Sequence, residues 1–304
     1  MKISIIMLAK NGREHIKRCL DKVTSQKGGH DLEIIAIDSG SNDGTADILK
    51  EYPLKLYTIQ AEDFSHSRTR NIGASLATGE YIVYLSQDAE PVDEDWLNCL
   101  IAPFFKDASV GAVFGKHVPT GKSNPVNRFH IQWIYGNDEL IKCKNSEFEF
   151  PRKYFSFSNV NAAVRKDLLM RFPFREDLLF CEDVYLAKVL LSNGYKVVYN
   201  AAAAVYHSHD YSMAEIFNRY FDIAVAYDKI GILNKTRDIE GEGKGYLLKE
   251  LKYLAENGYW TWVPYALANN LIKYLGFKMG CAERILPFGL KKRISKYWYK
   301  NAEE

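Results

Sequence analysis

Alternating strand-like and helix-like segments fill the first hundred residues, and they constrain the fold more than any other feature. Apolar runs typical of strands alternate with segments whose apolar residues recur every three or four positions. The expected strands cover residues 2–8, 32–38, 54–60 and 81–85, and the expected helices cover 13–26, 45–53 and 65–77. This alternation is typical of a parallel sheet in an α/β domain, whose ligands lie beyond the carboxyl ends of the strands.

The pattern changes after Pro91. The segments expected there are a helix over 93–105, a strand over 111–119, a loop-rich stretch over 115–155, a short strand and helix over 157–172, a helix over 183–193 and a strand over 195–209. From Ser212 the chain is helical, aromatic and increasingly basic. We therefore predict an α/β domain over 1–211, the part expected to hold any ligand site, and a C-terminal helical region over 212–304.

Length, composition and cysteine pattern limit the class of protein. The 304 residues are 47% hydrophobic, enough to bury a sizeable core. The five cysteines are scattered and form no zinc pattern, so we expect reduced thiols in a cytoplasmic protein. The most apolar run, 260–277, is interrupted by Asn269, Asn270 and Lys273, and a spanning helix needs about 20 apolar residues. We expect no membrane span.

Positive charge gathers near the C-terminus, although the whole chain carries only +2. Residues 246–300 hold ten Lys or Arg against three Glu, a local +7, interleaved with twelve aromatic residues. Basic and aromatic side chains together suit an anionic membrane surface, so we expect peripheral attachment to the inner face of the plasma membrane. A small helical domain with a solvated charged face is the alternative. Nucleic-acid binding is disfavoured because no recognised nucleic-acid fold accompanies the cations.

Two carboxylates stand where strands end. Asp38 ends the strand LEIIAID and begins the turn DSGSNDGT, where it could accept hydrogen bonds from a base or a ribose, or only shape the turn. Asp88 follows YIVYL and could bind a hard divalent cation together with substrate phosphates. Its alternative role is to cap the helix that begins near Asp93. The chain has no GxGxxG, which disfavours a dehydrogenase-type dinucleotide site.

Two further elements could complete a site. Glu182 and Asp183 stand at the head of a predicted helix, where one carboxylate can cap the helix and the other can act as an acid or base. His207 and His209 follow an apolar strand, and their spacing points both to one side, beside Asp210. A metal or catalytic role and a structural role for the histidines both stay open at this stage.

Six segments in order resemble one enzyme family. DSGSNDGT, FSHSRTRNIGA, YIVYLSQDA, FSNVNAAVRKDLL, CEDVYLAKVL and VYHSHDYS, spread over residues 1–212, resemble the family 2 inverting glycosyltransferases of the GT-A fold, most closely the bacterial rhamnosyltransferase branch. The resemblance implies a mixed, mainly parallel central sheet with a C-terminal helical region. It implies a nucleotide-sugar donor, best dTDP-L-rhamnose with UDP-sugars as competitors, and Mg²⁺ or Mn²⁺. The acceptor would be a glycan or a polyprenyl-diphosphate-linked sugar of a cell-surface polysaccharide.

The same resemblance implies roles for individual residues. Those expected at the donor are Asp38, Arg70, Asn71, Gln87 and Asp88. Asp88 and one histidine, His207, would bind the metal, although the sequence does not decide between His207 and His209. Asp183 would be the base, with Glu182 at the helix start or positioning the acceptor. Those expected on the sugar or acceptor side are Asn159, Asn161 and His209.

One position departs from the family pattern. Ser86 stands where the usual acidic triplet begins with aspartate, which removes one carboxylate. We expect weaker metal affinity rather than lost activity. Two alternatives stay open: a catalytically inactive nucleotide-sugar or glycan-binding protein, prompted by Ser86, and a nucleotidyltransferase. The latter would carry a Gly-rich basic loop after the first strand, where AKNGREH offers one Gly.

Overall fold

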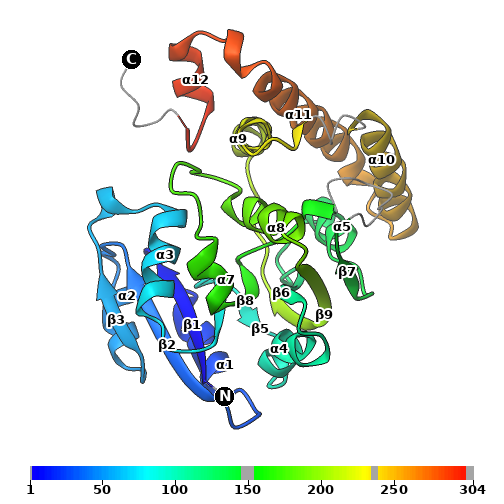
Figure 1. Ribbon diagram of the computed structural model, residues 1–304. Helices are drawn as coiled ribbons and strands as arrows, with labels where there is room; N and C mark the ends of the chain where they lie inside the picture. The colour runs from blue at the N-terminus through cyan, green and yellow to red at the C-terminus, as the bar shows by residue number, and fades with distance from the viewer. Residues whose placement is uncertain (1, 145–153, 234–238, 299–304) are drawn as a thin grey trace.

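The computed structural model describes residues 2–144, 154–233 and 239–298. One mixed sheet forms the centre, with strand order β3-β2-β1-β4-β8-β6-β9-β5 and with β7 paired to β9. Helices cover both faces of the sheet, and the C-terminal helices lie together beyond one end of it (Figure 1).

The first four strands of the sheet are parallel, as predicted from their alternation with helices. The strands are β1 (Lys2–Ala9), β2 (Asp31–Asp38), β3 (Lys55–Thr58) and β4 (Tyr81–Leu85), and the helices between them are α1 (Ile16–Thr24), α2 (Thr45–Lys50), η1 (Ala61–Asp63) and α3 (His66–Leu76). Helix α1 begins three residues later than predicted. The backbone N–H groups of Asn11 and Arg13 instead donate to the side chains of Ser41 and Asp43, which fixes the two loops against each other.

The second half of the sheet is largely antiparallel. Strand β8 (Asn161–Arg165) lies antiparallel between β4 and β6 (Val110–Val118), whereas β9 (Lys196–Tyr206) is parallel to β6. Short strands β5 (Glu90–Pro91) and β7 (Leu140–Lys142) pair antiparallel with β9. The helices of this half are α4 (Trp96–Lys106), α5 (Pro125–Ile134), α7 (Lys166–Arg171) and α8 (Glu182–Ser192).

The prediction of a loop-rich stretch over 115–155 is corrected by α5 and β7. Pro125 lies within this stretch, but it occupies the first turn of α5, where a missing N–H costs nothing. Asn124 caps the helix by accepting a hydrogen bond from the N–H of Asn127. Residues 145–153 of this stretch lie outside the described residues.

Two apolar cores, one on each face, hold the sheet. One packs α1 and α4 on the sheet through side chains such as Leu20, Trp96 and Leu100, all with no exposed surface. The other packs α3, α7 and α8 on the opposite face, around Tyr84 and Phe174. Burial on both faces explains why these strands have nearly continuous apolar sequences.

The C-terminal region is helical, as predicted. It contains α9 (Met213–Lys229), α10 (Ile239–Glu256), η3 (Trp260–Trp262), α11 (Val263–Cys281), η4 (Glu283–Ile285) and α12 (Phe288–Ile294). Helices α9 and α11 can approach closely because Gly276 has no side chain. A Cβ at this position would lie 2.5 Å from the carbonyl oxygen of Phe217. The division expected between residues 211 and 212 falls in the loop between β9 and α9. Within the described ranges, no helix is long and apolar enough to cross a bilayer.

Candidate active site

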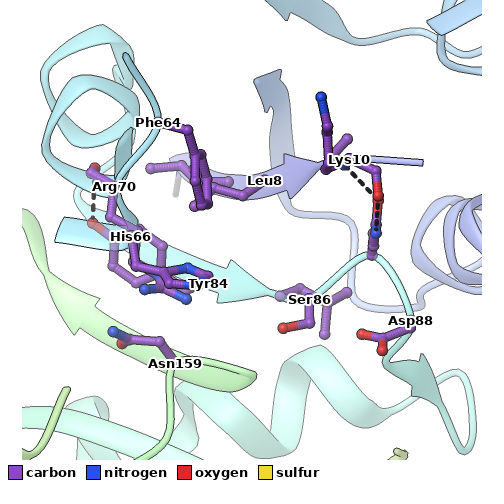
Figure 2. A pocket seen from close by; sticks show the side chains of 13 residues that line it. Leu8, Lys10, Phe64, His66, Arg70, Tyr84, Ser86, Asp88 and Asn159 are labelled. Atoms are coloured by element: carbon purple, nitrogen blue, oxygen red, sulfur yellow. Dashed lines mark hydrogen bonds between the residues drawn. The ribbon is translucent and has the colours of Figure 1, made fainter. Parts of the chain in front are cut away.

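A pocket of about 260 Å³ opens at the carboxyl ends of β1 and β4 (Figure 2). Its walls come from the ends of these strands, from the segment that begins α3, and from Asn159 before β8. The predicted donor residues that line it are Arg70, Gln87 and Asp88. The parallel strands thus bring together loops that are far apart in sequence.

Gln87 joins two of these loops. Its side-chain amide accepts a hydrogen bond from the N–H of Lys10 at 3.0 Å and donates one to the carbonyl of Lys10 at 2.9 Å, and these are the dashed lines beside Lys10 in Figure 2. Gly12 leaves room for this amide, since a Cβ there would lie 2.2 Å from Oε1 of Gln87. Gln87 therefore fixes the pocket wall, and direct contact with the donor stays a prediction.

Asp38 is buried and shapes its own turn. Its carboxylate accepts hydrogen bonds from the N–H groups of Gly40 and Ser41, at 3.1 and 3.0 Å, and from the hydroxyl of Ser41. The Nζ of Lys10 closes the same turn by donating to the carbonyls of Ser39 and Gly40, both at 2.7 Å. Asp38 does not line the pocket, so its contact with a nucleotide also stays a prediction.

Glu182 is committed to a buried ion pair. Its Oε1 meets Nη1 of Arg70, and both side chains are about nine-tenths covered. The Nδ2 of Asn159 lies 3.5 Å from the same oxygen, whereas the buried Oδ1 of Asn159 has no hydrogen-bond partner among the described residues. A carboxylate held by a guanidinium is poorly suited to take a proton. The geometry thus favours positioning rather than catalysis for Glu182.

Asp183, the next residue, is placed differently. It is half-buried at the start of α8, and Oδ1 accepts a hydrogen bond from the N–H of Val184 at 2.8 Å. Burial and the charge of Glu182 raise the pKa of Asp183 to about 7, against the opposing effects of Arg70 and the N–H groups of Val184 and Asn159. A carboxylate with this pKa suits a general base at neutral pH.

Asp88 lies with two histidines rather than one. One ligand atom each from Asp88, His207 and His209 can be chosen so that all three lie within 4.8 Å of one another. Asp88 Oδ2 is 3.0 Å from Nε2 of His209, and Oδ1 is 3.4 Å from Nδ1 of His207. Burial alone would raise the pKa of Asp88, but the two neighbouring imidazoles lower it well below its usual value.

This cluster fits a divalent cation. The Nδ1 of His207 is buried yet makes no hydrogen bond of acceptable geometry within the described chain, which leaves its lone pair for a ligand bond. One carboxylate with two imidazoles suits Mn²⁺ better than Mg²⁺, which prefers oxygen ligands. Asp88 is not a helix cap, because Asp95 is the residue that precedes α4. His209, expected on the acceptor side, thus lies at the candidate metal centre.

Comparison with known proteins identifies the family. The sequence matches Glycosyl transferase family 2 over residues 4–172, more than half of the chain. The chain belongs to glycosyl transferase family 2. The predicted resemblance and its enzymatic class, a glycosyltransferase, are confirmed.

Two curated relatives of this glycosyltransferase match over most of their length. It is 31% identical to the O-antigen chain rhamnosyltransferase RfbN of Salmonella typhimurium, over 98% of this chain and 95% of that protein. It is 32% identical to the O-antigen chain rhamnosyltransferase WbaN of Salmonella anatum, over 87% of this chain and 84% of that protein.

Solved structures confirm the predicted GT-A fold of this glycosyltransferase. The mannosyltransferase PcManGT from Pyrobaculum calidifontis, in complex with GDP-Man and Mn²⁺, superposes with a TM-score of 0.62 at 19% identity, over 91% of this chain and 86% of that one. S. aureus TarS 1–349 in complex with UDP superposes with a TM-score of 0.55 at 17% identity, over 93% and 91% of the two chains.

Asn161 and Asn71 are two further predicted residues of the glycosyltransferase that do not line the pocket. Asn161 has no exposed surface, and its amide accepts from the indole of Trp96 and donates to the carbonyl of Ala203. The expectation that Asn161 faces the sugar is therefore not supported. Asn71 exchanges two hydrogen bonds with the backbone of Phe174, at 2.9 and 3.0 Å, and so fixes the loop before α8.

Sequence reasoning missed several site residues of the glycosyltransferase. Phe64, His66 and Tyr84 line the pocket, and burial with the charge of Arg70 lowers the pKa of His66 to about 4. The imidazole is therefore neutral at physiological pH. His66 stands within FSHSRTRN, so the motif could have drawn attention to it.

His117 was also missed. Its buried ring stacks on Tyr135 at 4.0 Å and meets the ring of His207 edge-on at 5.3 Å. It therefore orients a candidate metal ligand from β6. Only the pairing of β6 with β9 brings the two histidines together, so nothing local in the sequence signals the contact.

Proposed function

We propose that this glycosyltransferase transfers L-rhamnose from dTDP-L-rhamnose to a hydroxyl of a glycan or lipid-linked oligosaccharide, with inversion, in the synthesis of a cell-surface polysaccharide. Similarity over most of the chain to two O-antigen chain rhamnosyltransferases supports the sugar and the pathway class. UDP-sugars are the competing donors.

The observation that supports the reaction type is that two carboxylates, Asp88 after β4 and Asp183 at the start of α8, have different surroundings. Asp88 stands with two imidazoles, and its lowered pKa keeps it anionic. Asp183 stands at the head of α8 with a raised pKa, next to a pair that holds the charge of Glu182. Two carboxylates with opposite pKa shifts suit two roles, one at the leaving group and one at the attacking hydroxyl.

The proposed mechanism follows from the charges that develop. Cleavage of the bond between sugar C1 and the donor diphosphate leaves negative charge on the diphosphate. Asp88, His207 and His209 would hold a divalent cation, which would supply positive charge at the diphosphate. Asp183 accepts the proton of the acceptor hydroxyl as its oxygen attacks C1 from the opposite face, which inverts the anomeric centre. The Arg70–Glu182 pair holds the first turn of α8 and so orients Asp183.

The second histidine explains how Ser86 can be tolerated. Ser86 lines the pocket, and its N–H donates to the carbonyl of Val160 at 3.0 Å. The triplet therefore offers one carboxylate, but His209 brings a second imidazole to Asp88. We take His209 to replace the ligand that is lost, so the cation site stays complete.

We further propose that an anionic bilayer holds the enzyme near a polyprenyl-diphosphate-linked acceptor, at the inner face of the plasma membrane. Between Pro264 and Lys278 the exposed positions of α11 are apolar over successive turns and end in a lysine; they are Pro264, Leu267, Ala268, Leu271, Tyr274, Leu275 and Lys278. Trp260 before it is 65% exposed, and Ile285 after it is 83% exposed. Helix α11 carries two lysines and no acidic residue, which matches an anionic lipid surface.

A donor panel tests the proposed function. The purified enzyme would be incubated with Mn²⁺, a lipid-linked or glycan acceptor, and dTDP-L-rhamnose, UDP-hexoses or GDP-mannose in turn. We expect turnover with dTDP-L-rhamnose and inversion at C1 in the product. Clear turnover of a UDP-sugar, with none of dTDP-L-rhamnose, would reject dTDP-L-rhamnose as the donor. The assignment to the glycosyltransferases would still stand.

A further inference from the structure

Arg219 differs from the other arginines that the structure describes. Three of these arginines make no hydrogen bond or ion pair: Arg171, Arg219 and Arg293. Arg171 and Arg293 are exposed, so water satisfies their guanidinium groups. Arg219 is half-buried on α9. A half-buried guanidinium without an anionic partner is a candidate site for an anionic ligand.

Aromatic rings hold this guanidinium in place. Its Cζ lies 4.5 Å from the ring centroid of Tyr211 and 5.5 Å from that of Phe180. The ring of Phe180 stacks in turn on Tyr297, at 4.7 Å and 10°. Stacking on rings fixes the guanidinium while leaving N–H groups available for a phosphate.

The nearby acids do not satisfy Arg219. Glu215 and Asp222 lie on the same helix, α9, and the charge of Arg219 acts to lower the pKa of each. Glu215 bonds to the N–H and hydroxyl of Ser212 in a capping box. Asp222 bonds to the hydroxyl of Ser295 and the N–H of Lys296. Both carboxylates thus have other partners, and the guanidinium has no ion pair with either.

The position of Arg219 links the two acidic centres. Tyr211 contacts the ring of His209, a candidate metal ligand, with centroids 5.6 Å apart. Phe180 stands three residues before Asp183 on the segment that leads into α8. Arg219 therefore lies between Tyr211, on the segment of the candidate cation cluster, and Phe180, on the segment that leads to the candidate base.

We propose that Arg219, held between Tyr211 and Phe180, binds the phosphate oxygens of a diphosphate group during sugar transfer. This inference rests on the proposed function, because that reaction supplies a diphosphate from two sources: the nucleotide donor and a lipid-linked acceptor. A guanidinium fork matches two phosphate oxygens, which a lysine cannot do. Arg219 is then a binding residue that the C-terminal helices contribute to the catalytic domain.

The test compares Arg219→Met, which keeps length and packing, with Arg219→Lys, which keeps the charge. Arg171→Met is the matched control, since Arg171 also lies over a ring, that of Phe172, but is exposed on α7. Titration calorimetry would measure the Kd of inorganic pyrophosphate, dTDP and UDP with Mn²⁺. Kinetics would measure KM for a polyprenyl-diphosphate-linked acceptor and for the same glycan without diphosphate. Thermal melts would check folding.

We expect Arg219→Met to weaken one diphosphate ligand by about 10- to 100-fold, the value of a hydrogen bond to a charged group. Arg219→Lys should recover part of the loss, and Arg171→Met should match wild type. A raised Kd for nucleoside diphosphates assigns the donor, and a raised KM confined to the diphosphate-linked acceptor assigns the acceptor. If folded Arg219→Met matches wild type in every measurement, the inference is overturned while the proposed function stands. Absence of transfer by wild type would count against the proposed function, and the pyrophosphate titration would still report on Arg219.

Discussion

Arg70 on α3 and Glu182 on α8 form a buried ion pair directly beside Asp183. The pair joins the segment FSHSRTRN to the segment CEDVYLAKVL, two of the six that carry the family resemblance. Its charges act on the candidate base in opposite directions, since Glu182 raises the pKa of Asp183 and Arg70 lowers it. Burial raises the pKa of Asp183 further, so we expect burial and the ion pair together to shape the pH dependence of sugar transfer.

Replacement of Glu182 tests this effect. In wild type, kcat/KM should rise with pH through about 7, because Asp183 must lose its proton to act as the base. Glu182→Gln removes the negative neighbour and leaves Arg70 unpaired, and both changes lower the pKa of Asp183. The acidic limb of the profile should move to lower pH, while the fold loses about 3–5 kcal/mol of stability because a buried charge is unpaired. If the acidic limb stays near pH 7 in the variant, the pH profile does not report the titration of Asp183, and the prediction is wrong.

Stability should respond to pH through the same carboxylate. An aspartate in the unfolded chain has a pKa of about 3.9, so the folded state holds the proton of Asp183 more tightly up to a pH of about 7. The contribution to stability is then full below pH 4 and is lost as pH rises towards 7. At pH 8 the free energy of unfolding of Asp183→Asn, measured by denaturant titration, should exceed that of wild type by roughly 2–4 kcal/mol. At pH 4 the two proteins should differ little. An equal or smaller stability of the variant at pH 8 would contradict the raised pKa.

The cation cluster predicts a graded loss of metal affinity. Asp88→Ala and His209→Ala should each weaken Mn²⁺-dependent nucleotide binding by about tenfold or more, since even loss of an outer partner costs that much. High Mn²⁺ should restore part of the binding, because two ligands and the donor phosphates remain. His15→Ala, at an exposed position before α1, is the control. Nucleotide titrations in the presence of EDTA measure the binding that does not depend on metal. If His209→Ala keeps full Mn²⁺ affinity, His209 is not a metal ligand and His207 is the one histidine left in that role.

Membrane attachment should depend on the apolar face of α11. We expect salt-sensitive co-sedimentation with vesicles that contain anionic lipid, since each engaged cation adds about 1 kcal/mol at low ionic strength. The double variant Leu267→Gln/Leu271→Gln should bind less, whereas Phe105→Gln, at an exposed position on α4, should not change binding. Equal binding to neutral and anionic vesicles, or none at low salt, would refute the proposed surface.

The alternation of local patterns was enough to predict β1 to β4 and the helices between them, because each segment buries its own apolar face. It was not enough to predict α5, where Pro125 lies within the stretch predicted to be loop-rich although it begins a helix capped by Asn124. The site shows the same limit. Asp88 and Asp183 stand at element ends that the sequence marks. The pairing of Gln87 with Lys10 and the contact of His117 with His207 depend on long-range sheet order, which no local pattern encodes.

The assignment of Asp183 as the base is the central claim, and Asp183→Asn tests it most directly. Single-turnover sugar transfer and the Kd of the donor nucleotide would be measured together with Mn²⁺. We predict that nucleotide binding stays within about twofold of wild type while transfer falls by roughly 10²- to 10⁴-fold, the contribution of a positioned general base. An Asp183→Asn enzyme that transfers sugar at a near wild-type rate would contradict the account, and loss of transfer in Glu182→Gln alone would move the base by one residue.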